Sequence, residues 1–467
     1  MVKRSPGIKL LFVALVAAIL VLPLLMIYAL VSEREVQNAR AEASITAGWG
    51  GPQVISGPVL AIPYVREDTR TEVVDGRSVT RTQLVRDELF LSPQQQAVAT
   101  QIEPTVRSRS IYRSVIYRAT LEGRARFALP ADLPRYGVTP DQLRLDQAEL
   151  RFGISDPRGL QSDARVVANG AALPLQPGKG LASSGGAGFF AFLDWAGAAP
   201  LEVQWRYSAR GSRSLSLVPR GGETRWEATS PWPSPSFGGS FLPETREVSA
   251  AGFTAAYSIT NLALGQGLLL LEDPGPPLPT GPGMEYLDPA AQVASAGGPS
   301  MAASIELVEP VDHYSRVDRS VKYGFLFIGF TFLAYFMFDV VGGARVAAAE
   351  YFLTGAGLVL FFVLLLAFAE VIGFTPAYLV ASAAIIGLLT AYSAAVLGTR
   401  RRAGFMAALL VALYALIYVL LSLDALSLMI GSVLLFLALA GVMYATRDID
   451  WSRPTGGDGD GEAEAAG

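Results

Sequence analysis

The chain has 467 residues, of which 51% are hydrophobic and only 17% charged, with a formal net charge of −4. An average soluble domain has about 25% charged residues, so the deficit predicts a membrane protein, and the small net charge predicts no nucleic-acid partner. The lack of cysteine excludes disulfides and thiolate metal ligands. A single histidine, His313, excludes a multi-histidine metal centre and disfavours a Ser-His-Asp site, so we expect no cofactor.

Residues 8–31 form the first apolar run, in which Lys9 is the only charge. As a helix the run rises about 36 Å, enough to cross a hydrocarbon core of roughly 30 Å. It is longer than the apolar part of a signal peptide and continues into SEREVQNARAEA, so we expect an uncleaved anchor. The alternative is weak cleavage at Ala39-Arg40-Ala41. Pro23 predicts a kink that a membrane helix tolerates.

The stretch WGGPQVISGPVLAIPY, residues 49–64, poses a choice between a phosphate-binding loop and a turn. It lacks the Lys-Ser/Thr ending of a phosphate loop and does not match G-x-G-x-x-G, so we expect no nucleotide. Its glycines, with Gly48, predict the end of the helix that leaves the membrane, and Val59 to Val65 predict the start of the first strand.

Residues 32–322 contain no further apolar run of spanning length and are rich in strand formers. Strands are predicted within 81–92, 105–130, 201–219 and 250–264. In the third, Leu201, Val203, Trp205 and Tyr207 alternate on one face, and a hairpin turn is expected near 210–213. Because strands do not alternate with helices, we expect mainly antiparallel sheets packed on each other, as one large domain or two intimate lobes.

Three irregular segments interrupt these strands: a flexible loop at 178–190, the aromatic-proline segment SPWPSPSFGGSFLP at 230–243, and a stiff loop at 274–283. A cluster of arginines would form either a basic face for an anionic envelope polymer or lipid headgroups, or simply the solvated face of a sheet. Its members are Arg107, Arg109, Arg113, Arg118, Arg124 and Arg126.

Residues 310–322 predict a helix that leads into the second span, with Tyr314 and Val317 near one stripe. This places a candidate membrane-surface junction at His313, Tyr314, Arg319 and Lys322. His313 there is either an interfacial residue or a pH sensor.

Five apolar runs follow in quick succession, at 323–341, 351–369, 376–397, 403–422 and 426–446, which gives six predicted membrane spans in all. Alternating spans put the basic short segments on one side, which should be cytoplasmic. These segments carry Lys3, Arg4, Arg345, Arg400, Arg401, Arg402 and Arg447. The N-terminus (1–7) and the acidic, disordered tail (447–467) are then cytoplasmic, and 32–322 lies outside.

The spans carry ionisable residues only at or beyond their ends, which disfavours an ion-driven carrier. Many small residues predict closely packed helices. The bundle is therefore expected to serve as a platform for the outer domain or for partner helices.

Several stretches resemble the CreD family of inner-membrane proteins, also described as colicin-tolerance or envelope-integrity proteins. They are LPLLMIYALVSEREVQNARAEA, GWGGPQVISGPVLAIPY, PWPSPSFGGSFLP, PVDHYSRVDRSVKYGFLFIGFTFLAYFMFD, GTRRRAGFMAALLVALYALIYVLL and MYATRDIDW. The resemblance implies a Gram-negative inner membrane, a periplasmic location for 32–322, and a role in envelope integrity or stress response linked to a two-component system and to β-lactam and colicin phenotypes. It supplies no enzymatic activity and no catalytic residues.

The leading hypothesis is a non-enzymatic envelope protein, held in the lipid bilayer, whose outer domain contacts an envelope component or a membrane-protein partner. The candidate interaction residues are Trp49, Gly50, Gly51, Pro52, Gln53, Trp232, Phe237 and Phe241. A second hypothesis is a permease or export component coupled to a cytoplasmic ATPase. A third, a periplasmic hydrolase, is disfavoured because no G-x-S-x-G appears and Lys179 is the only outer-domain lysine away from the membrane.

Overall fold

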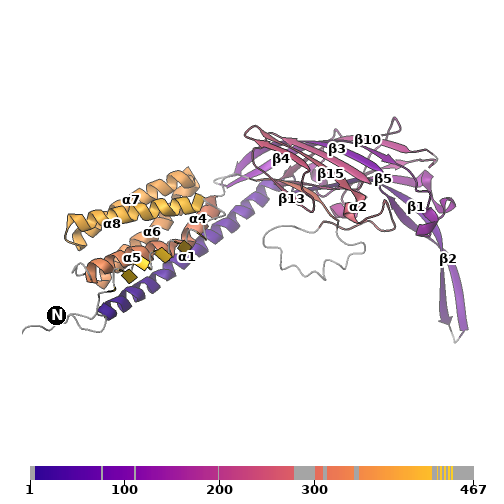
Figure 1. The fold of residues 1–467 in the computed structure, drawn as a ribbon. Helices are drawn as coiled ribbons and strands as arrows, with labels where there is room; N and C mark the ends of the chain where they lie inside the picture. Colours follow the sequence, from indigo (N-terminus) through magenta and orange to yellow (C-terminus); the bar gives the residue numbers. More distant parts are fainter. Residues whose placement is uncertain are drawn as a thin grey trace, which may run out of the picture. The chain divides into compact units, whose positions relative to one another are not determined.

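A computed structural model describes residues 6–74, 77–109, 112–197, 199–277, 300–308, 313–340 and 346–422, with scattered residues between 429 and 447 (Figure 1). The chain divides into two compact units. The helical unit comprises residues 1–39 and 311–467, and the β domain comprises residues 40–310. Within the described residues, five helices are long and apolar enough to cross a membrane.

The helical unit follows the predicted apolar runs. Its helices are α1 (Pro6–Thr46), α4 (His313–Lys322), α5 (Gly324–Val340), α6 (Ala348–Ile372), α7 (Phe374–Val396) and α8 (Arg400–Ser422). As expected, α1 continues beyond its apolar part, and the predicted helix at 310–322 is present as α4. The sixth span, 426–446, falls on a stretch of which only single residues are described, so it stays a prediction.

Aromatic rings and small residues hold the helical unit together. The ring of Phe361 makes edge contacts with the rings of Phe362 and Tyr414, at centroid distances of 5.0 and 4.8 Å. At Gly355 a Cβ would lie 2.0 Å from Cδ1 of Leu20, so only glycine lets α6 approach α1 this closely. The predicted role of small residues in close helix packing is confirmed at this position.

The β domain contains two sheets, shown in Figure 1. Sheet A has the order β13-β17-β11-β1-β5-β9-β8, with β2 paired to β1 and β16 paired to β2. Its strands are β1 (Gln53–Val74), β2 (Arg77–Leu91), β5 (Ala148–Ile154), β8 (Gln176–Pro177), β9 (Gly188–Leu193), β11 (Ser214–Val218), β13 (Pro235–Gly239), β16 (Leu269–Leu270) and β17 (Ala303–Leu307).

Sheet B has the order β14-β15-β12-β3-β4-β10-β6-β7. Its strands are β3 (Gln95–Arg109), β4 (Tyr112–Phe127), β6 (Arg165–Ala168), β7 (Ala171–Ala172), β10 (Leu201–Ser212), β12 (Glu223–Ser230), β14 (Thr245–Ser249) and β15 (Gly252–Thr260). The connections include a short helix, α2 (Asn261–Leu264), and 3-10 turns at Leu133–Tyr136, Pro140–Gln142, Leu145–Gln147, Pro157–Gly159 and Ala182–Ser184.

The core of the β domain lies between the two sheets. The predicted alternation along β10 is confirmed, since Leu201, Val203, Trp205 and Tyr207 are all buried. From sheet A, Phe152 meets the ring of Trp205 edge-on, with 5.7 Å between centroids. Both sheets contribute to one continuous hydrophobic core, so of the two alternatives the single large domain is correct.

Three sequence predictions about strands need correction. No hairpin forms near 210–213, because β10 pairs with β4 and β6 in sheet B whereas β11 pairs with β1 and β17 in sheet A. Arg213 (φ +63°) carries the chain from one sheet to the other, and burial of Leu215 and Leu217 fixes the second strand across the core. The run 105–130 contains the end of β3 and all of β4 rather than a single strand. The first strand begins at Gln53, ahead of Val59.

The remaining loops are only partly as expected. The sheets are mainly antiparallel, but the β1/β11 and β3/β12 pairs are parallel. The loop at 178–190 is folded onto sheet A, with Leu181 fully buried, and its last residues belong to β9. Most of the predicted stiff loop at 274–283 lies outside the described residues.

Candidate functional site

The turn after α1 is hydrogen-bonded to the loop that follows β5. The name clasp is used here for residues 47–53 together with 155–158. The amide N–H of Gly51 donates to Oδ2 of Asp156 (3.1 Å), and Nε2 of Gln53 donates to the carbonyl oxygens of Asp156 (3.0 Å) and Arg210 (2.8 Å). Gln53 is fully buried, and its Oε1 accepts from the amide of Asp156 (3.2 Å). The first strand is therefore fixed at its very first residue.

A charged pair completes the clasp. Arg158 donates through Nε and Nη2 to the two carboxylate oxygens of Asp156, each at 2.8 Å, and through Nη1 to the carbonyl of Ala47 (3.3 Å). The hydrogen bonds from Arg158 lower the pKa of the Asp156 carboxyl to about 2. The carboxylate therefore stays charged at physiological pH and keeps accepting the Gly51 amide.

Trp49 closes the clasp from one side. Its indole N–H donates to the carbonyl of Tyr117 (3.2 Å), and the guanidinium carbon of Arg210 lies 4.4 Å from its ring centroid, a cation–π distance. Gly50 has φ +140°, and a Cβ there would lie 2.8 Å from the carbonyl oxygen of Arg210. The predicted turn is confirmed. Gly50, Gly51 and Gln53 make contacts within the β domain, whereas Pro52 is exposed.

The aromatic-proline segment forms an edge of sheet A. It contains β13, which among the described residues pairs only with β17. The indole N–H of Trp232 donates to the carbonyl of Val308 (3.0 Å), and the ring of Phe237 packs edge-on against Phe253 (5.7 Å). The backbone of Phe241 forms an isolated parallel β-bridge with that of Ala303. These three aromatics are half-buried against the core, whereas Leu242 beside them is 66% exposed.

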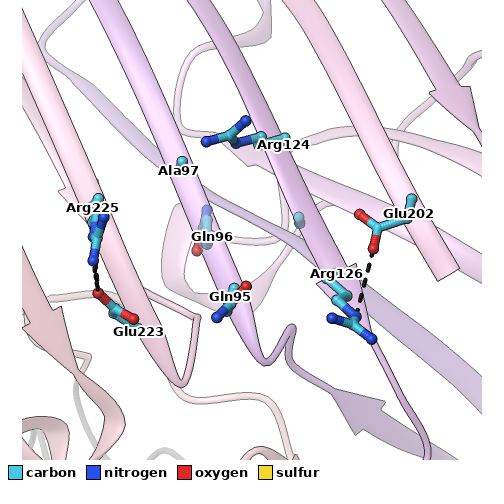
Figure 2. Close-up of a pocket in the computed structure, with 9 residues that line it drawn as sticks. Gln95, Gln96, Ala97, Arg124, Arg126, Glu202, Glu223 and Arg225 are labelled. Carbon is cyan, nitrogen blue, oxygen red and sulfur yellow. Dashed lines mark hydrogen bonds and ion pairs between the residues drawn. The ribbon is translucent and has the colours of Figure 1, made fainter. Parts of the chain in front are cut away.

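A pocket on the outer face of sheet B was not anticipated from the sequence. It has a volume of about 330 Å³ and crosses β12, β3, β4 and β10 (Figure 2). Its lining residues, called the polar trough below, are Gln95, Gln96, Ala97, Arg124, Ala125, Arg126, Glu202, Glu223 and Arg225. On the middle strand, Ala97 has only a methyl group between the longer side chains of Arg124 and Arg225, which leaves the depression open (Figure 2).

The charges of the polar trough do not cancel. Arg126 pairs with Glu202 (3.5 Å) and Arg225 with Glu223 (2.7 Å), as the dashed lines in Figure 2 show. The guanidinium of Arg124 is exposed and has no hydrogen-bond or ion-pair partner among the residues that the structure describes. One guanidinium with five donors is therefore left to meet an anionic group.

The wider arginine cluster is largely a mixed-charge face. Arg107, Arg113, Arg118, Arg124 and Arg126 are exposed on β3 and β4, and Arg109 ends β3. Carboxylates from the same or neighbouring strands lie among them, as in the pair Arg206–Glu122 (2.9 Å). The solvated-face alternative thus describes most of the surface, and an uncompensated positive charge remains at Arg124. The bare sequence did not show this, because the pocket-lining carboxylates Glu202 and Glu223 are remote from β4 in the chain.

The predicted junction residues lie on α4, where His313 and Tyr314 form the first turn. Lys322 pairs with Asp318 one turn earlier (2.7 Å), and Tyr323 donates its amide to the carbonyl of Arg319. The role of His313 as a pH sensor stays a prediction. Within the described parts of the chain, no group of three or more His, Asp or Glu side chains could hold a metal ion.

Apolar helices of spanning length joined to a large mixed-sheet domain define a membrane protein with several spans and an extramembrane β domain. The family model described as "Inner membrane protein CreD" matches residues 5–452. Inner membrane protein CreD of Escherichia coli (strain K12) is 31% identical over 441 residues, which cover 93% of this chain and 91% of that protein. The chain belongs to the CreD family of inner-membrane proteins.

Solved structures add nothing to this assignment. An M1 zinc metallopeptidase from Deinococcus radiodurans shares 10% sequence identity over 36% of this chain and 38% of its own, with a TM-score of 0.19. A substrate-bound mutant of the same peptidase gives the same TM-score. Likeness at that level carries no argument about fold or activity.

Proposed function

We propose that this chain is a non-enzymatic envelope protein whose β domain lies in the periplasm and binds a carboxylate-bearing envelope component in the polar trough. The observation that carries the proposal is the exposed guanidinium of Arg124, which has no partner in the described part of the chain, in a pocket whose other arginines are paired. The membership of the family and the spanning helices support an anchoring role for the helical unit.

The chemistry of the pocket favours an anionic, hydrogen-bonding ligand over an apolar one. Its lining consists of arginine, glutamate and glutamine side chains around two alanines. Small-molecule pockets of about 300–1,000 Å³ are usually lined mainly by apolar groups. A polar depression across four strands instead suits one segment of an extended polymer. The peptide carboxylates of peptidoglycan have the charge that such a surface would recognise.

Replacing Arg124 by glutamine should weaken binding to purified peptidoglycan sacculi about tenfold, because a hydrogen bond to a charged group contributes about 1.5–3 kcal/mol. Co-sedimentation of the full-length protein in detergent, titrated with sacculi, measures the bound fraction. Arg118→Gln is the matched control, since Arg118 is an exposed arginine on the same face of β4, outside the trough. An equal loss in both variants, or none in either, would contradict a site at the trough.

The proposed orientation has its own test. Alkaline phosphatase is active only outside the cytoplasm, so a fusion at Gly178 in the β domain should be active and a fusion at Gly404 near the start of α8 inactive. The reverse pattern would place the β domain in the cytoplasm. In that case binding to sacculi could have no role in cells, and co-purification of an ATPase with the full chain would support an export component instead.

A further inference from the structure

Part of the first hairpin extends beyond both sheets. β1 and β2 stay paired from Val65↔Arg86 to Val74↔Arg77, whereas the pairing of β1 with β5 already ends at Ala61↔Glu149. Residues 65–74 and 77–86 are called the ribbon here. Among the described residues no third strand pairs with the ribbon, and Figure 1 shows β2 projecting from the rest of the domain. Ten residue pairs give it a length of about 34 Å.

The ribbon is poorly supported by its own chain. Two-stranded hairpins are marginally stable in water, and an open edge presents unpaired backbone groups that template pairing with another strand. Among its described side-chain contacts are the ion pair of Arg66 with Asp87 and the hydroxyl contact of Thr69 with Thr82 (3.1 Å). Leu84, on β2, is 73% exposed. The edges of this ribbon are therefore the part of the domain best prepared for a partner strand.

The charge order along β1 identifies the partner. Every second residue is charged with alternating sign, as Arg66, Asp68, Arg70 and Glu72. An antiparallel copy of the same strand, placed so that Thr69 lies opposite its counterpart, sets Arg66 opposite the partner's Glu72. The same register sets Asp68 opposite the partner's Arg70, so all four opposed pairs have opposite charges. Opposite charges directly across a sheet are favourable and like charges are unfavourable.

Neighbouring registers lack this match. The backbone groups of two opposed residues point either both toward the shared edge or both away from it, so the register can shift only in steps of two residues. A shift of two residues in one direction places Arg66 opposite the partner's Arg70 and Asp68 opposite the partner's Asp68, which are like-charge pairs. A shift of two residues in the opposite direction places Asp68 opposite the partner's Glu72 and Arg70 opposite the partner's Arg70, which are again like-charge pairs. The β2 side of the ribbon offers no such pattern, because its only charges are positive: Arg77, Arg81 and Arg86.

We propose that two copies of the chain associate through the free edges of β1, antiparallel and centred on Thr69. This is a two-fold symmetric interface in which each strand supplies the same residues to the other, as most homodimers use. The partner is a second copy because the charges of this edge complement their own reversed order. The inference does not depend on the polar trough or on its ligand.

A cysteine on the symmetry axis tests the register. The chain has no cysteine, so Thr69→Cys introduces a single thiol. Opposed Cα atoms in an antiparallel pair lie about 4.5–5.5 Å apart, within the usual disulfide range of about 4.4–6.8 Å. The full-length variant in native membranes should form a covalent dimer on mild oxidation. Thr82→Cys is the matched control, because Thr82 lies opposite Thr69 within the ribbon and its loss removes the same hydroxyl contact.

The expected result is a dimer yield several-fold higher for Thr69→Cys than for Thr82→Cys. Equal yields, or no dimer from Thr69→Cys, would overturn the proposal. In the Thr69→Cys background, Arg66→Glu or Glu72→Arg alone should lower the yield about fivefold, since each creates two like-charge pairs. Combining both charge changes should restore it. Such a recovery of the dimer yield could not result from a more stable ribbon within one chain, because the carboxylate introduced at position 66 would still lie beside the carboxylate of Asp87. Failure of the combined variant to recover would contradict the register.

Discussion

Replacing Asp273 by alanine should lower the free energy of unfolding of the β domain by about 3–5 kcal/mol, because it leaves a buried guanidinium without its partner. Nη2 of Arg220 donates to Oδ1 of Asp273 at 3.0 Å, and the two side chains are only 2% and 8% exposed. Burial lowers the pKa of Arg220, and Asp273 opposes that shift. The other carboxylate oxygen accepts the amide of Ala182, so the same residue fixes the loop on sheet A.

Tryptophan fluorescence during urea unfolding of the full chain in detergent measures this effect, since five of the six tryptophans lie in the β domain. Glu223→Ala is the matched control. It removes the partner of Arg225 in a pair that is 70% and 38% exposed, which should cost at most about 1 kcal/mol. The double variant Arg220→Met/Asp273→Leu should lose less stability than Asp273→Ala. If Glu223→Ala and Asp273→Ala lowered the free energy of unfolding by similar amounts, breaking the buried pair would cost no more than breaking the exposed one, and the prediction would be wrong.

Replacing Gln53 by leucine should cost the β domain about 3 kcal/mol. The change leaves the carbonyl group of Arg210 and the amide of Asp156 without their shared partner, and each buried unsatisfied group costs about 1–3 kcal/mol. The carbonyl of Asp156 loses one of two donors, since it also accepts the amide of Gly159. The same fluorescence measurement applies. Gln147→Leu is the control, because Gln147 is exposed and its side chain makes only surface hydrogen bonds, accepting from Arg86 and donating to Asp146. A fully stable Gln53→Leu protein would show that the clasp is dispensable.

The features that the sequence predicted are those with local causes. A helix crosses a bilayer because its own residues are apolar over sufficient length, so the spans at 351–369, 376–397 and 403–422 needed no tertiary information. The turn at Gly50 is likewise local, since glycine after a long helix stops it. The alternation along β10 showed which of its residues are buried.

The features that it did not predict join distant parts of the chain. The alternation along β10 is the same whichever strand lies beside it, so the supposed hairpin with β11 could not be separated from a crossing between sheets. The polar trough gathers charges from β12, β4 and β10, and no short motif marks such a set. One signal was overlooked: Asp75-Gly76 between two strand-forming runs is a strong hairpin pattern, and it would have pointed to the ribbon.

The position of β17 in sheet A sets a condition on biogenesis. β17 lies between β13 and β11, and its residues, Ala303–Leu307, are made just before the second apolar helix. At about 5–20 residues per second, a ribosome needs on the order of ten to fifty seconds to proceed from β1 to β17. Until then sheet A lacks an interior member, and the nascent polypeptide exposes unpaired strand edges. Completion of the β domain must therefore follow emergence of almost its entire length, and chaperones have that interval in which to protect it.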